Sequence, residues 1–239
     1  GQMDDALPML SQIHEAGLTA IVRGYLGSDT ARVSLLACDG VTGGLSGGSV
    51  YRVSGTAVVG AASRPWSLIV KVLRETEATA ARSGPYYWRR ERDVAVSTIT
   101  DDLPDGLSAA RFVATTDRSP SEVWLWFEDL GPEPDPRTTE AWAAIAGAFA
   151  RWQAPYLLGK PPPSHPWLPR NWLEQWCLDS GPVDLDGCAD DPLLRRMYPD
   201  SAAASAQNFW RGRARYFAAY RQLPCVVNHM DAFWRNLFV

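Results

Sequence analysis

The sequence predicts an α+β protein of two parts, a β-rich first part followed by a mainly helical one. Strand-like runs of apolar residues dominate the chain up to residue 128, and apolar residues recur at helical spacing over most of the remaining chain. Between the two, Glu128–Pro136 (EDLGPEPDP) brings together a glycine and three prolines. This change of composition is typical of a domain boundary. We therefore divide the chain into an N-terminal lobe, 1–128, and a hinge with a C-terminal lobe, 129–239.

The composition indicates a globular protein and argues against two classes of function. Of the 239 residues, 46% are hydrophobic and 21% are charged, which is enough apolar material for a core. The net charge of −4, without a basic run, argues against nucleic-acid binding. No apolar segment approaches the ~20 residues of a membrane span. The four cysteines are scattered without a C-x-x-C motif, so we expect a cytoplasmic protein with reduced thiols. The sequence does not indicate an oligomeric state.

The first part reads as a helical segment followed by a series of strands. Apolar residues at helical spacing over 4–26 predict a helix with a break near Gly17. A further helix is predicted over Tyr86–Ile99, because Gly84-Pro85 marks its start. The predicted strands, in chain order, are Arg32–Val41, Val50–Val59, Trp66–Leu73, Ala110–Thr115 and Val123–Phe127.

A glycine-rich turn, Gly43–Ser49 (GGLSGGS), separates the first two strands. Two strands joined by a glycine turn form a β-hairpin by default, and the turn alone favours that interpretation. The alternative is a loop whose backbone N–H groups approach nucleotide phosphates, since glycines remove the side chains in the way. The turn is not a P-loop, because no Lys follows the glycines and no helix begins there.

Lys71 is the one charged residue in the apolar run Ser67–Leu73 (SLIVKVL). Both faces of this strand are otherwise apolar, so the ammonium needs either an anionic partner or a route along its stem to water. Both interpretations remain open on the strand alone. Glu91, twenty residues later, lies on the apolar face of the next predicted helix. Each of the two residues offers the counter-charge that the other lacks.

The second part is predicted to be helical with two irregular stretches. Each predicted helix has one apolar face. The proline-rich stretch is expected to be an irregular loop. The Asp-rich stretch lacks the ligand order of a calcium-binding loop, so we interpret it as a solvated loop. The predicted segments are a helix that Thr138 or Thr139 caps, an irregular loop over Pro155–Pro169, a helix over Asn171–Leu178, an acidic loop over Asp179–Asp191 and a long helix from Asp200 or Ser201 to about Arg221.

His229, Asp231 and Asn236 form an H-x-D-x-x-x-x-N motif near the end of the sequence. This is the spacing of a phosphoryl-transfer catalytic loop, in which the Asp orients or deprotonates the attacking hydroxyl and the Asn holds a metal ion. Short apolar runs at Cys225–Val227 and Leu237–Val239 predict a strand on either side. Three fixed positions recur by chance in unrelated chains, so the motif gains weight only from the features upstream of it.

Together these features form an ordered set: glycine turn, strand lysine, helix glutamate, hinge, helical segment and H-x-D-x-x-x-x-N motif. In this order the sequence resembles the aminoglycoside phosphotransferase family of small-molecule kinases, which is itself similar to choline kinases. The resemblance covers about residues 30–239. The segments that carry it are Gly43–Tyr51 (GGLSGGSVY), Ser67–Leu73 (SLIVKVL), Tyr86–Val94 (YYWRRERDV), Trp124–Gly131 (WLWFEDLG) and His229–Phe238 (HMDAFWRNLF).

The resemblance implies a bilobal, protein-kinase-like fold. Its N-terminal lobe would hold an antiparallel sheet and a helix, and its C-terminal lobe would be mainly helical. The resemblance also implies an enzyme that uses ATP and Mg²⁺ to phosphorylate a hydroxyl group of a small molecule. Most of the rate would come from positioning and charge neutralisation.

The roles that the resemblance implies fall into three groups. Lys71 would contact the ATP phosphates and pair with Glu91, and the turn residues would lie over the phosphates. The hinge residues would supply backbone contacts to adenine. In the last motif, Asp231 would be the base or orienting carboxylate, Asn236 would bind Mg²⁺ and His229 would brace the loop. The turn residues are Ser46, Gly47, Gly48 and Ser49, and the hinge residues are Glu128, Asp129 and Leu130.

The sequence departs from the family's pattern at two places. Met230 stands where the family commonly has Gly, which is tolerable if φ at Met230 stays negative. Family members continue beyond the motif into a strand with a metal-binding Asp, whereas this sequence ends at Val239. We expect a longer enzyme whose C-terminal lobe is incomplete here; the alternative is a pseudokinase that binds a nucleotide or a partner without catalysis. A protein kinase is a weaker alternative, since the sequence has no D-F-G or A-P-E motif after the loop.

Overall fold

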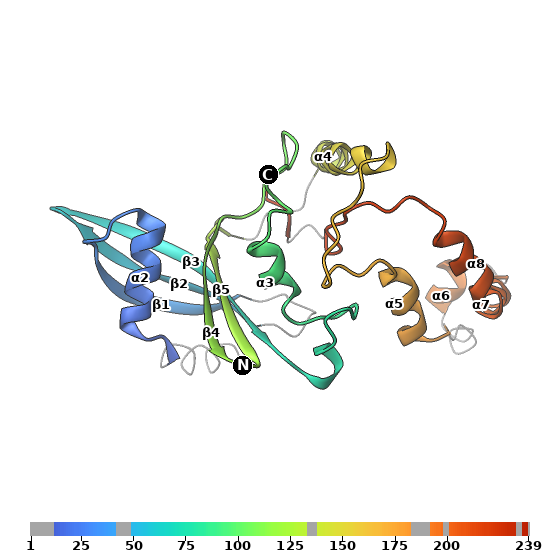
Figure 1. Cartoon of the computed structure of the whole chain (residues 1–239), viewed down its shortest axis with the longest axis horizontal. Helices are drawn as coiled ribbons and strands as arrows, with labels where there is room; N and C mark the ends of the chain where they lie inside the picture. Colours follow the sequence, from blue (N-terminus) through green and yellow to red (C-terminus); the bar gives the residue numbers. More distant parts are fainter. Residues whose placement is uncertain are drawn as a thin grey trace. The chain divides into compact units, whose positions relative to one another are not determined.

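The computed structural model describes residues 12–41, 49–132, 138–182, 192–197, 201–232 and 236–238. It is an α+β structure, with one five-stranded antiparallel sheet and several helices (Figure 1), as the sequence predicts. The chain divides into two compact units. The first consists of Gly1–Arg82, Tyr86–Trp152 and Asn228–Val239 and holds the sheet; the second consists of Ser83–Pro85 and Gln153–Val227. The division into lobes at residue 128 stays a prediction.

The sheet has the strand order β1-β2-β3-β5-β4, and all neighbouring strands are antiparallel. All five predicted strands are present. The largest differences are in β3 and β4: β3 starts at Ala62 rather than Trp66 because it pairs with β2 from Ala62 to Val72, and β4 runs to Ser119 rather than Thr115. Pro65 is tolerated there because it lies beyond the stretch that pairs with β5. The strands are β1 (Arg32–Val41), β2 (Ser49–Val59), β3 (Ala62–Arg74), β4 (Phe112–Ser119) and β5 (Glu122–Glu128).

One face of the sheet packs against α2 (Glu15–Leu26) and forms the core of the first unit (Figure 1). Every second residue of β2 and β3 points to this side, because side chains alternate along a strand. Leu68 and Val70 are fully buried there. The opposite face therefore carries the residues between them, among them Arg52 and Lys71.

Gly55 of β2 lies in this core beneath the indole ring of Trp66. A Cβ at this position would come within 1.9 Å of the Ser34 carbonyl oxygen and 2.7 Å of the Trp66 ring. The close approach of β1 and the packing of the indole therefore both require glycine here.

The helix that follows β3 is shorter than predicted, since α3 spans Arg90–Ala95 and not Tyr86–Ile99. Ser97 ends the helix by competing for its backbone groups. The Ser97 hydroxyl donates to the Val94 carbonyl oxygen at 2.8 Å and accepts from the Ile99 amide at 3.3 Å. Such local side-chain bonds offer the backbone an alternative to the helical pattern.

The helix α4 (Thr139–Leu157) starts as predicted but ends later. Thr138 caps it, because its hydroxyl accepts from the Ala141 amide at 3.2 Å. The prediction that Pro155 begins an irregular loop is wrong at this end. A proline removes its own N–H bond and crowds the preceding turn, but the helix continues past it here, and the Leu158 amide still donates to a carbonyl four residues earlier, at 3.1 Å.

In the second unit the predicted long helix is interrupted at Gly212 (φ −87°, ψ 3°). Glycine inside a helix costs about 1 kcal/mol relative to alanine, which favours a break there. The rings of Trp172 and Trp176 stack 5.9 Å apart, as their helical spacing predicts. An ion pair between Glu174 and Arg221 joins two of the helices. The helices are α5 (Trp172–Ser180), α6 (Pro192–Met197), α7 (Ala202–Arg211) and α8 (Arg213–Tyr220).

The described residues also contain a short 3₁₀ helix, η1 (Glu77–Thr79). None of the described helices has both the length and the apolar character that crossing a membrane requires. Most of the predicted acidic loop, Asp179–Asp191, lies outside the described residues.

Candidate functional site

Lys71 of β3 and Glu91 of α3 form an ion pair. Lys71 lies on the face of the sheet turned away from α2, because Val70 and Val72 on either side of it are buried in the core. Both side chains stay partly exposed, Lys71 at 37% and Glu91 at 41%. The predicted pairing is therefore confirmed, and both interpretations of the strand lysine apply: it has an anionic partner, and its side chain reaches solvent.

An apolar surface lies beside Lys71 on the same face. Ile69, two residues earlier, is directly opposite Phe127 of β5. The Lys71 ammonium nitrogen is 5.5 Å from the centre of the Phe127 ring, within the range of a cation–π contact. This face therefore combines a cation with an aromatic and an aliphatic side chain, which suits a ligand with a planar ring and a negative charge.

The glycine-rich turn leads into β2, whose first residues lie opposite the part of β3 that carries Lys71. Ser49 starts β2 opposite Val72, and Val50 lies opposite Lys71. The turn therefore ends next to Lys71. A loop that covers the phosphates has to lie next to the lysine that contacts them. The other predicted turn residues, Ser46, Gly47 and Gly48, lie outside the described residues.

The described residues of the H-x-D-x-x-x-x-N motif are joined by hydrogen bonds. The Asn236 amide donates to the backbone oxygen of Asp231 at 2.9 Å and to its carboxylate at 2.8 Å. The Asp231 backbone N–H donates to Nδ1 of His229 at 3.3 Å, so His229 braces the loop as an acceptor. The flanking strands that the sequence predicted are not formed in the described residues, 225–227 and 237–238. A strand exists only through pairing with a neighbour, and apolar sequence alone does not supply one.

Met230 lies between His229 and Asp231 with φ +70°. The condition under which the family's pattern would tolerate Met here, a negative φ, is therefore not met. The bonds of Met230 N to Asn228 Oδ1 (3.4 Å) and of the next amide to His229 close a tight turn. The left-handed region costs a non-glycine residue about 1–2 kcal/mol. Within the described part of the chain, Met230 is the only non-glycine residue with positive φ. Strain is thus stored beside the candidate catalytic carboxylate.

His229 links this loop electrostatically to the strand–helix ion pair. Desolvation by neighbouring atoms lowers the pKa of the imidazole below its ordinary value; Asp231 opposes this, Lys71 adds to it and Glu91 opposes it. The ring also packs edge-on against Phe149 of α4, with the ring centres 6.0 Å apart. The charges of the ion pair and of the loop therefore lie close enough to interact, and all of them belong to the first unit.

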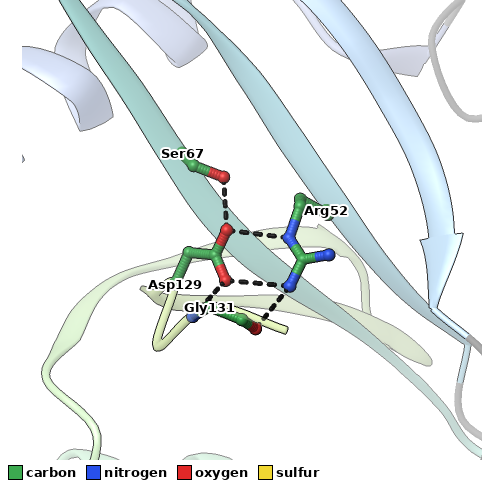
Figure 2. Close-up of polar contacts among 4 residues, drawn as sticks. All are labelled: Arg52, Ser67, Asp129 and Gly131. Atoms are coloured by element: carbon green, nitrogen blue, oxygen red, sulfur yellow. Dashed lines mark hydrogen bonds and ion pairs between the residues drawn. The ribbon is translucent and has the colours of Figure 1, made fainter. Parts of the chain in front are cut away.

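The connector that follows β5, residues 129–131, is held by a network that the sequence did not predict (Figure 2). The Asp129 carboxylate accepts from Nε (2.8 Å) and Nη2 (3.1 Å) of Arg52 and from the Ser67 hydroxyl (2.5 Å). It also accepts from the Gly131 amide at 3.0 Å, and Arg52 donates to the Gly131 carbonyl oxygen at 2.7 Å. The Asp129 side chain is only 10% exposed.

Arg52 and Asp129 stabilise each other's charged form. Burial alone would raise the pKa of Asp129, but the hydrogen bonds from Arg52, Ser67 and the Gly131 amide lower it below its ordinary value. The hydrogen bond to Asp129 is the main reason why the pKa of Arg52 is raised. The network therefore stays charged, and it fixes the connector through its side chain.

The other two predicted hinge residues are placed differently. Glu128 ends β5, where its carboxylate accepts from the Arg111 amide at 2.6 Å and its own amide donates to the Arg111 carbonyl oxygen at 3.0 Å. Leu130 is 45% exposed. The connector thus presents Leu130 to solvent between two anchored residues.

For a metal ion, the loop offers the amide oxygen of Asn236 next to the Asp231 carboxylate. The amide N–H group bonds the carboxylate, since an amide oxygen facing it would be repelled, and this leaves the amide oxygen as a ligand atom. Across the described residues, no group of three or more His, Cys, Asp or Glu side chains could hold a metal ion. The oxygens present fit Mg²⁺, which commonly binds through one or two side chains together with phosphates and water.

Comparison with family models, with curated proteins and with solved structures finds no match for this chain. The function proposed for this chain therefore rests on its sequence motifs and on the geometry of the site.

Proposed function

We propose that this chain is an ATP-dependent phosphotransferase that moves the γ-phosphate to a hydroxyl group of a small molecule, as in the aminoglycoside phosphotransferase family. The observation that carries the proposal is that the Lys71–Glu91 pair and the His229–Asn236 loop belong to one compact unit, where the charges of the pair act on the His229 imidazole. A lysine held by a helix carboxylate, together with such a loop, is the machinery that phosphoryl transfer requires.

Each group has a defined task in such a reaction. Lys71 has one carboxylate partner and is partly exposed, so its ammonium has protons left for phosphate oxygens. Asp231 would orient or deprotonate the acceptor hydroxyl, and Asn236 would hold the carboxylate in place through its amide. The Asn236 amide oxygen, with the Asp231 carboxylate beside it, would hold Mg²⁺, whose charge would help to neutralise the phosphates. The rest of the rate comes from positioning.

The proposal includes a bilobal, protein-kinase-like fold with a hinge at the connector, whose backbone at Glu128, Asp129 and Leu130 would bind adenine. It is supported by an antiparallel sheet in which β3 carries the lysine and β5 leads directly into the connector. A cytoplasmic location and a small-molecule acceptor belong to the same proposal.

The substitution Asp231→Asn tests this function, because it removes the charge and keeps the shape of the side chain. We expect ADP formation to fall at least about 10²-fold, as for the loss of a general base. The Kd for ATP with Mg²⁺ should change less than about threefold. Isothermal titration calorimetry measures the Kd, and phosphorus NMR follows ADP.

A matched control for this experiment is Asp117→Asn. Asp117 is a carboxylate of β4 that is 58% exposed and pairs with Arg89, so its replacement should change neither binding nor turnover. Wild-type protein that binds no ATP in the presence of Mg²⁺ would contradict the proposal.

A second candidate function is that of a pseudokinase, which binds a nucleotide or a partner without catalysis. The Asn236 amide already donates two hydrogen bonds to Asp231, and one of them occupies the carboxylate that catalysis would need. This arrangement favours the second candidate. Binding of ATP by the wild-type protein, without ADP formation in the presence of any acceptor alcohol, would support it over the enzyme.

A further inference from the structure

Arg52, Ser67, Asp129 and Gly131 form a unit that we call the connector clamp (Figure 2). One carboxylate oxygen of Asp129 accepts from Arg52 and from the Gly131 amide, and the other accepts from Arg52 and from Ser67. The bond from Arg52 to the Gly131 carbonyl oxygen completes the ring. Gly131 has φ +97°, a conformation that glycine adopts without strain. The connector clamp thus fixes both ends of 129–131.

The strand before the connector does not need this clamp. Glu128 is already held by its pairing with Leu68 of β3 and by two hydrogen bonds to Arg111. The connector clamp therefore acts on the segment after the strand, whose middle residue, Leu130, is exposed. Removing the two charges of a partly buried ion pair from water costs free energy. Its presence at a surface segment indicates that the conformation of this segment matters.

The connector clamp lies on the same face of the sheet as Lys71. Arg52 is opposite Ile69, and Ser67 precedes Lys71 by four residues on β3. At about 3.3 Å per residue, Ser67 and Lys71 are ~13 Å apart along the strand. Ile69 lies between them, opposite Phe127. This face therefore has a cation at one end, apolar side chains in the middle and a fixed backbone segment at the other end. An extended nucleotide has the matching order: phosphates at one end, a planar ring, and the polar edge of the base at the other end.

We propose that Arg52 and Ser67 are positioning residues for nucleotide binding that act through Asp129. The connector clamp holds the backbone of 129–131, next to the strand-anchored Glu128, in the geometry that hydrogen-bonds the polar edge of a purine base. This inference rests on the function proposed above and adds to it residues that touch no ligand. A connector that is already ordered avoids the entropy cost of ordering it on binding, and this gain appears as affinity. The clamp should therefore affect the base and not the phosphates.

Adenosine and inorganic tripolyphosphate, each with Mg²⁺, probe the two ends of the site separately. Arg52→Met keeps the apolar stem and removes the guanidinium. We expect the Kd of adenosine to rise about tenfold and that of tripolyphosphate to change less than about twofold, both measured by isothermal titration calorimetry. Arg74→Met is the matched control, because Arg74 pairs with Glu122 across the same sheet outside the clamp. It should leave both constants unchanged.

Equal weakening of both probes by Arg52→Met would show a general loss of structure and overturn the inference. Unchanged adenosine affinity would overturn it as well. If circular dichroism shows that Arg52→Met does not fold, Ser67→Ala decides the question. It removes one hydrogen bond to Asp129 and should raise the Kd of adenosine about threefold, again with tripolyphosphate unaffected.

The same titrations separate this inference from the function on which it rests. Wild-type protein that binds neither ATP nor the two probes would overturn the proposed function and the inference together. Wild-type protein that binds ATP, with Arg52 and Ser67 variants that bind adenosine as tightly as the wild type does, would overturn the inference alone.

Discussion

Two ion pairs on one face of the sheet are built for different purposes. In the connector clamp, the Asp129 side chain is 10% exposed and accepts four hydrogen bonds. In the other pair, Lys71 and Glu91 are 37% and 41% exposed. A carboxylate that is buried and saturated has no capacity for another partner, whereas a partly exposed ammonium has. The first pair shapes a segment of the chain, and the second is available to a ligand.

Backbone strain also distinguishes the turn at the connector clamp from the turn at Met230. At the connector clamp the positive φ belongs to Gly131, which adopts it freely. In the loop whose His229 senses the charge of Lys71, the positive φ belongs to Met230, which does not. Strain is therefore absent at the connector clamp and present next to Asp231, where the proposed chemistry would take place.

The largest effect should come from Lys71→Met. Removing one preorganised cationic donor should lower kcat at least about 10²-fold. The melting temperature should fall by less than about 3 °C, because an exposed ion pair contributes about 0–1 kcal/mol. Phosphorus NMR and differential scanning calorimetry measure the two quantities. A large loss of stability with normal turnover would show that the Lys71–Glu91 pair stabilises the fold and is not used by a ligand.

The substitution Asp129→Ala should do the opposite and mainly lower the stability of the fold. It leaves Arg52 without its partner, which costs several kcal/mol in a buried pair; because Arg52 is 34% exposed, we expect about 2 kcal/mol. For a chain of this size that is a fall in melting temperature of about 4–8 °C. Asp117→Ala, at a side chain that is 58% exposed, serves as the control and should stay within about 0.5 kcal/mol of the wild type.

Acid should abolish the stabilisation by the connector clamp. The pKa of Asp129 is lowered in the folded protein, so the stability that its charge contributes is present above the ordinary aspartate value of about 3.9 and is lost as pH falls through the folded pKa. The difference in free energy of unfolding between wild type and Asp129→Asn should therefore shrink from about pH 7 to about pH 3. Urea titrations over this range measure it. A difference that does not change with pH would mean that the charge of Asp129 contributes nothing.

The smallest effect should come from Met230→Gly. Relief of about 1–2 kcal/mol of strain, less the entropy cost of a glycine, should leave a gain of about 0.5 kcal/mol. The matched control is Met230→Ala, which removes the thioether but keeps the Cβ that causes the strain. Equal stabilisation by alanine and glycine in calorimetry would show that the side chain beyond Cβ, and not the backbone, is responsible.

The elements of the sheet could be predicted from sequence because strand patterns are local. Alternation and β-branched runs marked each strand, and two of the errors in the helices fell at residues that disfavour a continuing helix. Ser97 ends α3 early through its own hydrogen bonds, and Gly212 divides the predicted long helix. Both residues were visible in the sequence, but the outcome depends on a balance of about 1 kcal/mol that periodicity does not report.

The candidate site was predicted in part for a related reason. Lys71 and Glu91 were found because each is a charge in apolar surroundings, and the same rule applied to Arg52 in β2 would have marked it too. Its partner could not be read from spacing, because Asp129 lies 77 residues away and meets Arg52 only through the register of β2, β3 and β5. The positive φ of Met230 likewise follows from hydrogen bonds that close the loop, and no sequence pattern reports them.

The order of the strands has a consequence for how the sheet assembles. β1, β2 and β3 follow one another along the chain, and β4 and β5 form a hairpin, so these two pieces close through short loops. Their junction joins residues such as Arg74 and Glu122, which are 48 apart in sequence. Closing a longer loop costs more entropy and tends to happen later in folding. The connector clamp spans this junction, so we expect its bonds to slow unfolding more than they speed folding, and the junction to open first when the sheet comes apart.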